Sequence, residues 1–217
     1  MTTRRRLGVL GGTFDPIHNG HLRAGEAAQA ALNLDEIRVI PSHDPPHRPI
    51  VPKASAFHRF ALAALALQGR ESWRLSDAEL TRPGPSYTAH TLRALHAEGW
   101  DPAQIFFIIG SDAFAEIATW YEFPSVLDAA NFAIVARPGT TLTQAAERTA
   151  AVSSRLQTVG AGAGAVDPVR TGIFLVEAPT PDISSTGIRQ RLAAGRSIDD
   201  LVPAAVARYI HTQHLYD

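Results

Sequence analysis

One stretch near the start of the chain, GGTFDPIHNGHL at residues 11–22, combines residue types suited to holding phosphate. Its paired glycines lack a Cβ and leave room for a ligand against the backbone, and the following threonine adds a hydroxyl. His18 and His21 are three residues apart, so both rings share one face of a helix's first turn. The unpaired N–H groups of that turn attract anions. We interpret the stretch as a phosphate-binding turn with two imidazoles for phosphate chemistry; a tight turn with two surface histidines is the alternative.

A second phosphate-binding pattern lies near residue 185. Ser184-Ser185-Thr186 precedes a helical pattern with apolar Ile188 and Leu192. Thr186 and Arg189 are three residues apart and fall on one face of the first turn. Hydroxyls, N–H groups and a guanidinium at one helix N-terminus predict a phosphate clamp. The alternative is an ordinary capped helix with a solvated arginine.

Polar and aromatic residues follow the apolar run Ile105–Ile109. An unbroken apolar run is typical of a parallel strand that is covered on both faces. Asp112 comes shortly after this run, and ligands of doubly wound sheets bind beyond the carboxyl ends of strands. A helix N-cap is a second role for Asp112 and is compatible with the first. Trp120 and Tyr121 come next and form either a stacking platform or part of the core.

Two loops carry further candidate residues. The proline-rich segment 41–49 contains His47 and Arg48, which are either ligand contacts or incidental surface cations. The segment 83–88 ends in Ser86-Tyr87-Thr88, and we expect Thr88 to cap the following helix. Tyr87 is alternatively a packed loop aromatic.

Apolar runs that predict strands alternate with patterns that predict helices. The predicted strands are 7–10, 36–40, 73–80 (including its exit), 105–109, 132–136 and 173–176. The predicted helices are 22–32, 54–68, 88–98, 142–156, a helix closed by Gly195 and a last helix opened by Pro203. The second helix has an apolar stripe that consists of Phe57, Phe60, Ala61, Ala64, Leu65 and Leu67. The alternation predicts an α/β fold, a Rossmann-like doubly wound and mainly parallel sheet flanked by helices.

Composition narrows the class of protein. The 217 residues are 45 % hydrophobic, enough for one domain with a sizeable core. A net charge of −1 gives no sign of a nucleic-acid or acidic-membrane partner. Cysteine is absent, so disulfides and thiolate metal sites are excluded. The apolar run 7–10 is too short for a signal peptide, and 60–67 is far below the ~20 residues that span a bilayer. We expect a cytoplasmic protein.

These stretches resemble the nucleotidyltransferases with an [T/H]xGH signature, here His18-Asn19-Gly20-His21, and more narrowly the bacterial nicotinate-nucleotide adenylyltransferase family. The resemblance also includes Pro45–Arg48, Pro85–Thr88, Gly110–Asp112, Trp120–Tyr121, Arg137–Pro138 and Ile183–Arg189. It spans nearly the whole chain, with about residues 140–172 as the gap. It implies a single nucleotidyltransferase domain over 1–217, whose C-terminal helical part starts at about residue 184 and carries SSTGIR.

The resemblance implies transfer of AMP from ATP to nicotinate mononucleotide, which yields deamido-NAD and pyrophosphate. His18 and His21 would be catalytic. The implied ATP contacts are Gly11, Gly12, Thr13, Phe14, His18, His21, Ser185, Thr186 and Arg189. The implied acceptor contacts are His47, Arg48, Ser86, Tyr87, Thr88, Asp112, Trp120, Tyr121 and Arg137. Mg²⁺ is expected mainly on the ATP phosphates, with no dedicated protein metal site. Whether the protein forms a homo-oligomer is left open by the resemblance.

Three alternatives remain at this stage. The acceptor could be nicotinamide mononucleotide, or the chain could be another enzyme with the same signature, such as phosphopantetheine adenylyltransferase. Ser86-Tyr87-Thr88 and Trp120-Tyr121 disfavour the second of these. A noncatalytic dinucleotide-binding module or a dehydrogenase domain requires GxGxxG after the first strand, which GGTFDP does not supply.

Overall fold

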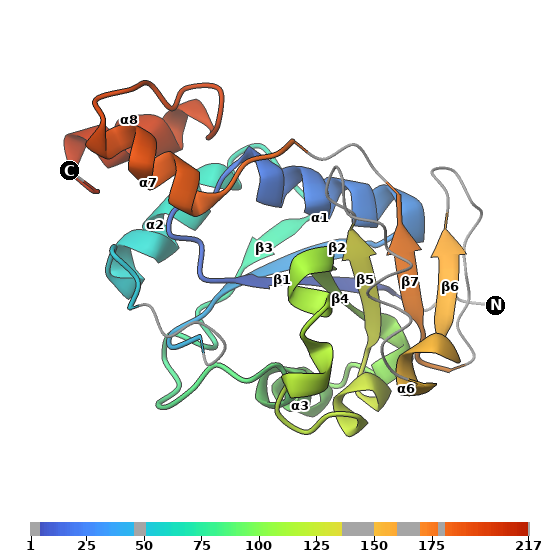
Figure 1. Ribbon diagram of the computed structural model, residues 1–217. Helices are drawn as coiled ribbons and strands as arrows, with labels where there is room; N and C mark the ends of the chain where they lie inside the picture. Colours follow the sequence, from blue (N-terminus) through green and yellow to red (C-terminus); the bar gives the residue numbers. More distant parts are fainter. Residues whose placement is uncertain (1–4, 46–50, 136–149, 160–169, 178–180, 217) are drawn as a thin grey trace.

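The computed structural model describes residues 5–45, 51–135, 150–159, 170–177 and 181–216. Within these ranges, seven strands form one sheet in which every neighbouring pair is parallel (Figure 1). The strands are β1 (Leu7–Gly12), β2 (Glu36–Pro41), β3 (Trp73–Leu75), β4 (Ile105–Gly110), β5 (Asn131–Val135), β6 (Leu156–Val159) and β7 (Ile173–Val176).

Helices connect these strands and cover the sheet. The α-helices are α1 (Asn19–Leu32), α2 (Ala56–Ala66), α3 (Thr88–Ala97), α4 (Ser111–Phe114), α6 (Ala150–Ser153), α7 (Ser185–Ala193) and α8 (Ala204–Thr212). Short 3-10 helices lie at η1 (Pro102–Gln104), η2 (Ile117–Thr119) and η3 (Ser125–Asp128). The predicted helices at 22–32, 54–68 and 88–98 and the last two helices are confirmed, with ends shifted by a few residues.

The strand order is β3-β2-β1-β4-β5-β7-β6. The chain therefore adds β2 and β3 outward from β1 in one direction and then β4 and β5 in the other, where β6 forms the edge and β7 lies between β5 and β6. Between β1 and β4 the order reverses, and this reversal leaves a crevice at the carboxyl ends of the two strands. The prediction of a doubly wound parallel sheet is confirmed.

Side chains that alternate along the strands build two cores. In β4, Phe106 and Ile108 face the core that contains residues of α1, α2, α7 and α8. Ile105, Phe107 and Ile109 face the opposite core, which contains residues of α3 and α4. Figure 1 shows α1 and α3 on opposite sides of the sheet. All five side chains are at most 7 % exposed, as the unbroken apolar run predicted.

The region around β6 differs from the prediction. A helix was predicted over 142–156; Ala150–Ser153 are helical, but Leu156–Val159 form an edge strand. Residues 142–149 lie outside the described ranges. Leu156 pairs with Ile173 of β7, so a neighbouring strand that is distant in sequence determines the local structure. Strand preference depends on such cross-strand packing more than helix preference does.

The predicted apolar stripe of the second helix is only partly correct, because Leu67 is buried and Leu65 packs against the core, whereas Phe57 and Ala64 are exposed. The buried side chains of this helix are Arg59, Leu62, Ala63 and Ala66. Phe57 is 88 % exposed, whereas Arg59 is only 2 % exposed. Arg59 turns inward because its guanidinium donates to carbonyl oxygens of two loops, and the helix is rotated accordingly. Hydrophobic periodicity cannot detect a buried arginine that is satisfied in this way.

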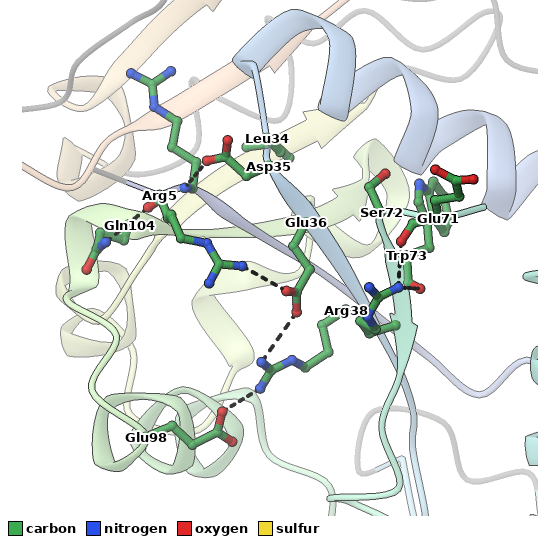
Figure 2. Close-up of polar contacts among 12 residues, drawn as sticks. Arg5, Leu34, Asp35, Glu36, Arg38, Glu71, Ser72, Trp73, Glu98 and Gln104 are labelled. Atoms are coloured by element: carbon green, nitrogen blue, oxygen red, sulfur yellow. Dashed lines mark hydrogen bonds and ion pairs between the residues drawn. The ribbon is translucent and has the colours of Figure 1, made fainter. Parts of the chain in front are cut away.

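Charged side chains join the amino ends of the first two strands, at the end of the sheet opposite the crevice (Figure 2). Glu36 accepts from Arg5 at 3.2 Å and from Arg38 at 3.4 Å, and Arg38 also binds Glu98 at 2.6 Å. Arg5 and Glu98 are 65 % and 49 % exposed, so each pair contributes little by itself. The network nevertheless connects β1, β2 and the end of α3.

A buried amide joins three segments at the start of β5. Asn131 is fully buried, and its Nδ2 donates to the carbonyl oxygens of Ala103 and Ile105, both at 3.1 Å. Its Oδ1 accepts from the Gly172 N–H at 2.9 Å. These bonds connect η1, β4, β5 and the turn before β7. Buried backbone groups in this position need partners from the protein.

We predict that Asn131→Ala lowers the free energy of unfolding by about 3 kcal/mol, because it leaves buried donors and acceptors unpaired. Urea unfolding followed by circular dichroism measures this loss. The control is Gln68→Ala, which removes an exposed amide and should change stability by less than about 0.5 kcal/mol. A loss below about 1 kcal/mol in Asn131→Ala would contradict the prediction.

Candidate active site

A cavity of about 540 Å³ opens at the carboxyl ends of β1 and β4, where the strand order reverses. This volume is typical of small-molecule sites. The cavity brings together residues from the two ends of the chain and from the middle. The sequence-predicted residues that line it are Gly11, Gly12, Thr13, Phe14, His18, His21, Ser86, Thr88, Asp112, Trp120 and Ser185.

The two histidines cap α1 in a reciprocal arrangement. His18 is the N-cap, and its Nδ1 accepts from the His21 N–H at 3.4 Å. The Nδ1 of His21 accepts from the His18 N–H at 3.2 Å. Because both Nδ1 atoms accept backbone protons, each neutral ring carries its own proton on Nε2. The rings stack with centroids 3.7 Å apart, which confirms that the two imidazoles lie side by side.

Phe14 shapes the turn before these histidines. Its φ angle is 51°, in the left-handed region that non-glycine residues seldom adopt. The buried ring meets His21 edge-on, with centroids 5.0 Å apart. A Cβ on Gly12 would lie 3.0 Å from the same ring. Gly12 is therefore needed by the packing of Phe14, in addition to any close approach of a ligand.

Asp15 connects the signature loop to three other elements. The carboxylate is 5 % exposed and accepts from the N–H groups of Lys53 at 2.8 Å and Ala54 at 3.0 Å. The hydroxyl of Tyr216 donates to it at 2.9 Å. Arg189 donates to the Asp15 carbonyl oxygen at 2.6 Å and lies 3.7 Å from the carboxylate. Burial and the neighbouring Asp15 charge raise the pKa of Tyr216, so its phenol remains a donor.

Arg59 joins the segments that follow β1 and β2. It donates to the carbonyl oxygen of Thr13 at 2.8 Å and to that of Ser42 at 2.6 Å. Burial lowers the pKa of Arg59, and the nearby Asp15 opposes this shift. Sequence analysis missed Arg59 and Asp15 as structural residues of the site. Asp15 lies inside the signature, but nothing in the sequence reveals which groups it contacts.

The second predicted phosphate clamp lies at the start of α7. Ser184 caps this helix through the Gly187 N–H at 3.0 Å. Ser185 lines the cavity and donates to the carbonyl oxygen of Pro16 at 2.9 Å. Arg189 donates to the Thr186 hydroxyl at 3.1 Å, so the predicted shared face is confirmed. Neither Thr186 nor Arg189 is among the residues that line the cavity, and their contact with phosphate stays a prediction.

The predicted aromatic pair divides between two environments. Trp120 lines the cavity and meets Phe107 and Phe132 edge-on, at centroid distances of 6.1 and 6.5 Å. Tyr121 is 44 % exposed and stacks on Tyr87 at 4.5 Å, away from the cavity lining. Trp120 is therefore the member of the pair that offers an aromatic surface to a ligand in this cavity.

Two predicted helix caps are wrong. The N-cap of α3 is Tyr87, and Thr88 is the first helical residue. The N-cap of α4 is Gly110, and Asp112 is the second residue of the helix. In both cases the helix begins at a different residue from the one that its capping preference suggested. Thr88 and Asp112 still reach the cavity.

Some of the predicted site residues lie outside the described part of the chain, and some residues that line the cavity were not predicted. His47, Arg48 and Arg137 lie outside the described residues. Glu79 and Ser42 line the cavity and are 7 % exposed, although the sequence singled out neither. An acidic residue in an irregular segment after a strand is expected on the surface, so no sequence signal identified Glu79.

The described residues also bear on metal sites and membrane spans. Among these residues, no group of three or more histidine, cysteine, aspartate or glutamate side chains is arranged to hold a metal ion. None of the helices in the described part of the chain is both long enough and apolar enough to span a bilayer. The described donor set therefore does not form a protein cage for a cation.

Known proteins are similar to this chain over nearly its whole length. The cytidylyltransferase-like family matches residues 9–191. A "Probable nicotinate-nucleotide adenylyltransferase" of Geobacter sp. (strain M21) is 40 % identical over 219 residues, 97 % of this chain and 98 % of that protein. One of the same name from Synechococcus sp. (strain JA-3-3Ab) is 39 % identical over 98 % of this chain and 95 % of its own length.

Solved structures share the fold over nearly the full length. The nicotinic acid mononucleotide adenylyltransferase of Plasmodium falciparum, complexed with NaAD, superposes with a TM-score of 0.69 at 18 % identity. The match covers 99 % of this chain and 98 % of that chain. The same protein complexed with APC gives a TM-score of 0.68 with the same coverage. At this level of identity the likeness supports the fold.

We predict that Tyr216→Phe lowers the free energy of unfolding by about 1.5–3 kcal/mol, because it removes a hydrogen bond to a buried carboxylate. Chemical denaturation at neutral pH measures the change. Tyr121→Phe is the matched control, since it removes a hydroxyl from a 44 % exposed side chain. Equal stability of the two variants would show that the Tyr216 hydroxyl does not secure Asp15.

Proposed function

The chain belongs to the cytidylyltransferase-like family and, within it, to the nicotinate-nucleotide adenylyltransferases, and we propose that it transfers AMP from ATP to nicotinate mononucleotide. The products are deamido-NAD and pyrophosphate, so the enzyme acts in NAD biosynthesis. The observation that carries this proposal is the convergence of His18, His21, Ser185 and Trp120 on one cavity. Donors suited to phosphate and an aromatic surface suited to a flat ring lie in the same space.

The reaction needs alignment and charge stabilisation more than a protein nucleophile. An oxygen of the acceptor's phosphate attacks the α-phosphorus of ATP and forms the new P–O bond. The bond between the α-phosphorus and the bridging oxygen of pyrophosphate breaks, and that oxygen leaves with the electron pair. Negative charge increases on the oxygens around the α-phosphorus and on the leaving group. Donors fixed around these oxygens lower the barrier.

His18 and His21 are suited to supply such donors. Their Nδ1 atoms accept backbone N–H groups, so in the neutral rings Nε2 is the atom that carries the proton and can donate to a phosphate oxygen. The stack between the rings and the edge contact with Phe14 hold their orientation. A ring that is already oriented loses little entropy in the transition state, which is how a fixed donor accelerates the reaction.

Mg²⁺ belongs to the proposal as part of the ATP substrate. The described residues form no cage for a cation, so a Mg²⁺ ion would take most of its ligands from the triphosphate and water. The Ser185 hydroxyl already donates its proton to the carbonyl oxygen of Pro16, so the protein's own contribution on this side would come from the N–H groups at the start of α7 and, by proposal, from Arg189. We also propose a cytoplasmic enzyme, on the basis of its near-neutral charge and lack of cysteine.

The cavity groups near Trp120 and Thr88 favour nicotinate mononucleotide over nicotinamide mononucleotide as the acceptor. Trp120 offers its ring to the pyridine, but stacking does not distinguish a carboxylate from a carboxamide. Thr88 lines the cavity at the start of α3, and no side chain caps this helix. The first N–H groups of α3 are therefore donors that a carboxylate can satisfy and that an amide NH₂ cannot. This preference also separates the proposal from the nicotinamide mononucleotide alternative.

We predict that His21→Ala lowers kcat by at least ~100-fold while the protein remains folded, because one fixed donor to the transferring phosphoryl group is lost. Pyrophosphate release with saturating Mg-ATP and nicotinate mononucleotide measures this loss. His211→Ala changes an exposed histidine on α8 and should retain normal kcat. Near-normal turnover in folded His21→Ala would remove His21 from catalysis.

We predict at least a tenfold preference in kcat/KM for nicotinate mononucleotide over nicotinamide mononucleotide, because an amide that faces only donors leaves groups unpaired at ~1–3 kcal/mol. A side-by-side assay of both mononucleotides and of phosphopantetheine, at saturating Mg-ATP, measures the preference. Trp120→Ala should raise the acceptor KM. Equal use of the two mononucleotides would overturn the proposed acceptor, and an unchanged KM would remove Trp120 from its pocket.

A further inference from the structure

Glu79 is a buried carboxylate on the wall of the cavity that the proposed mechanism does not use. It follows β3 in an irregular segment and is 7 % exposed. The hydroxyl of Thr91, on α3, donates to its Oε1. Burial raises the pKa of Glu79, while hydrogen bonds from Thr91 and Ser86 and the charge of Arg82 oppose the shift. Burying a carboxylate is unfavourable unless such donors surround it.

Ser86 links this carboxylate to a second loop. Its hydroxyl bonds to Glu79 and also accepts from the His43 N–H at 2.9 Å. Its own N–H donates to the carbonyl oxygen of Asp44 at 2.8 Å. A serine hydroxyl has only one proton. Because the Glu79 carboxylate takes that proton, the Ser86 oxygen is left as an acceptor for His43.

The two loops joined in this way border the part of the cavity in which the proposed acceptor, nicotinate mononucleotide, would bind. Residues 42–45 follow β2, and Ser42 and Pro45 line the cavity. Residues 83–87 lead into α3, whose first residue, Thr88, also lines it. The Thr91 bond fixes Glu79 to α3, which is a rigid element. Glu79 thus connects both loops to α3: it bonds to Thr91 of the helix and to Ser86, and Ser86 bonds to His43 of the other loop.

We propose that Glu79 is a positioning residue for the acceptor nucleotide, which acts by orienting Ser86 and, through it, the loop that follows β2. This inference rests on the proposed function, because it assumes that nicotinate mononucleotide binds between these loops. Glu79 itself need not touch the substrate. A carboxylate suits this role because it can accept from two hydroxyls at once, whereas a glutamine amide has one oxygen acceptor.

The test compares Glu79→Gln with the wild type in steady-state assays of pyrophosphate release. We expect the KM for nicotinate mononucleotide to rise about tenfold, with the KM for Mg-ATP unchanged and kcat within about threefold. Glu71→Gln, an exposed glutamate before β3, is the matched control and should retain all three constants. Thermal unfolding of each variant checks the fold.

A double-mutant cycle with Ser86→Ala tests the route of the effect. If Glu79 acts through Ser86, the double variant should have no higher acceptor KM than the worse single variant; independent effects would multiply. An unchanged acceptor KM in Glu79→Gln, an equal rise in both KM values, or multiplicative effects would overturn the inference. If Glu79→Gln does not fold, Thr91→Val tests the inference in its place. This variant removes only one donor to Glu79 and should still raise the KM for nicotinate mononucleotide about threefold; an unchanged KM would overturn the inference.

The wild-type assay separates this inference from the proposed function. If the wild type releases no pyrophosphate with nicotinate mononucleotide and Mg-ATP, the proposed function is wrong, and the inference that assumes it is overturned with it. If the wild type is active but Glu79→Gln retains its acceptor KM, the proposed function stands and only the role of Glu79 is overturned.

Discussion

The burial of Asp15 is the constraint on which the site depends. Its carboxylate accepts from the segment just before α2 and from Tyr216, and its backbone oxygen accepts from Arg189 of α7. A buried carboxylate needs several donors, and here the donors come from segments far apart in the sequence. The loop between β1 and α1 is therefore held by the segment before α2, by α7 and by the C-terminal segment after α8. His18 and His21 follow this loop directly, so their placement depends on it.

The topology of the sheet explains why the remaining functional groups meet. Parallel strands all end at one edge, and the order reverses between β1 and β4. The groups at these two exits, His18 on one side and Asp112 with Trp120 on the other, line the same cavity. The polar network around Glu36 and Arg38 lies at the opposite end of the strands (Figure 2). The sheet thus separates residues that support it from residues that can bind a ligand.

Much of the fold and part of the site could be predicted from the sequence. The run Ile105–Ile109 is a central strand, and His18 and His21 lie together, because apolar runs and short spacings report local geometry directly. The strand β6 could not be predicted, since its pairing with β7 is a long-range contact. Tyr121 could not be separated from Trp120, since adjacent residues leave the chain in different directions.

The sequence by itself determined the class of fold, the family and the close spacing of the two signature histidines. Only the tertiary structure decided which charged residues are buried and what they hold. Arg59 lies on the inner face of α2, and Glu79 lies on the cavity wall, because donors or acceptors from distant loops surround them. The physical reason is that a charge enters the interior only where the folded chain supplies its partners. No local pattern of residue types contains that information.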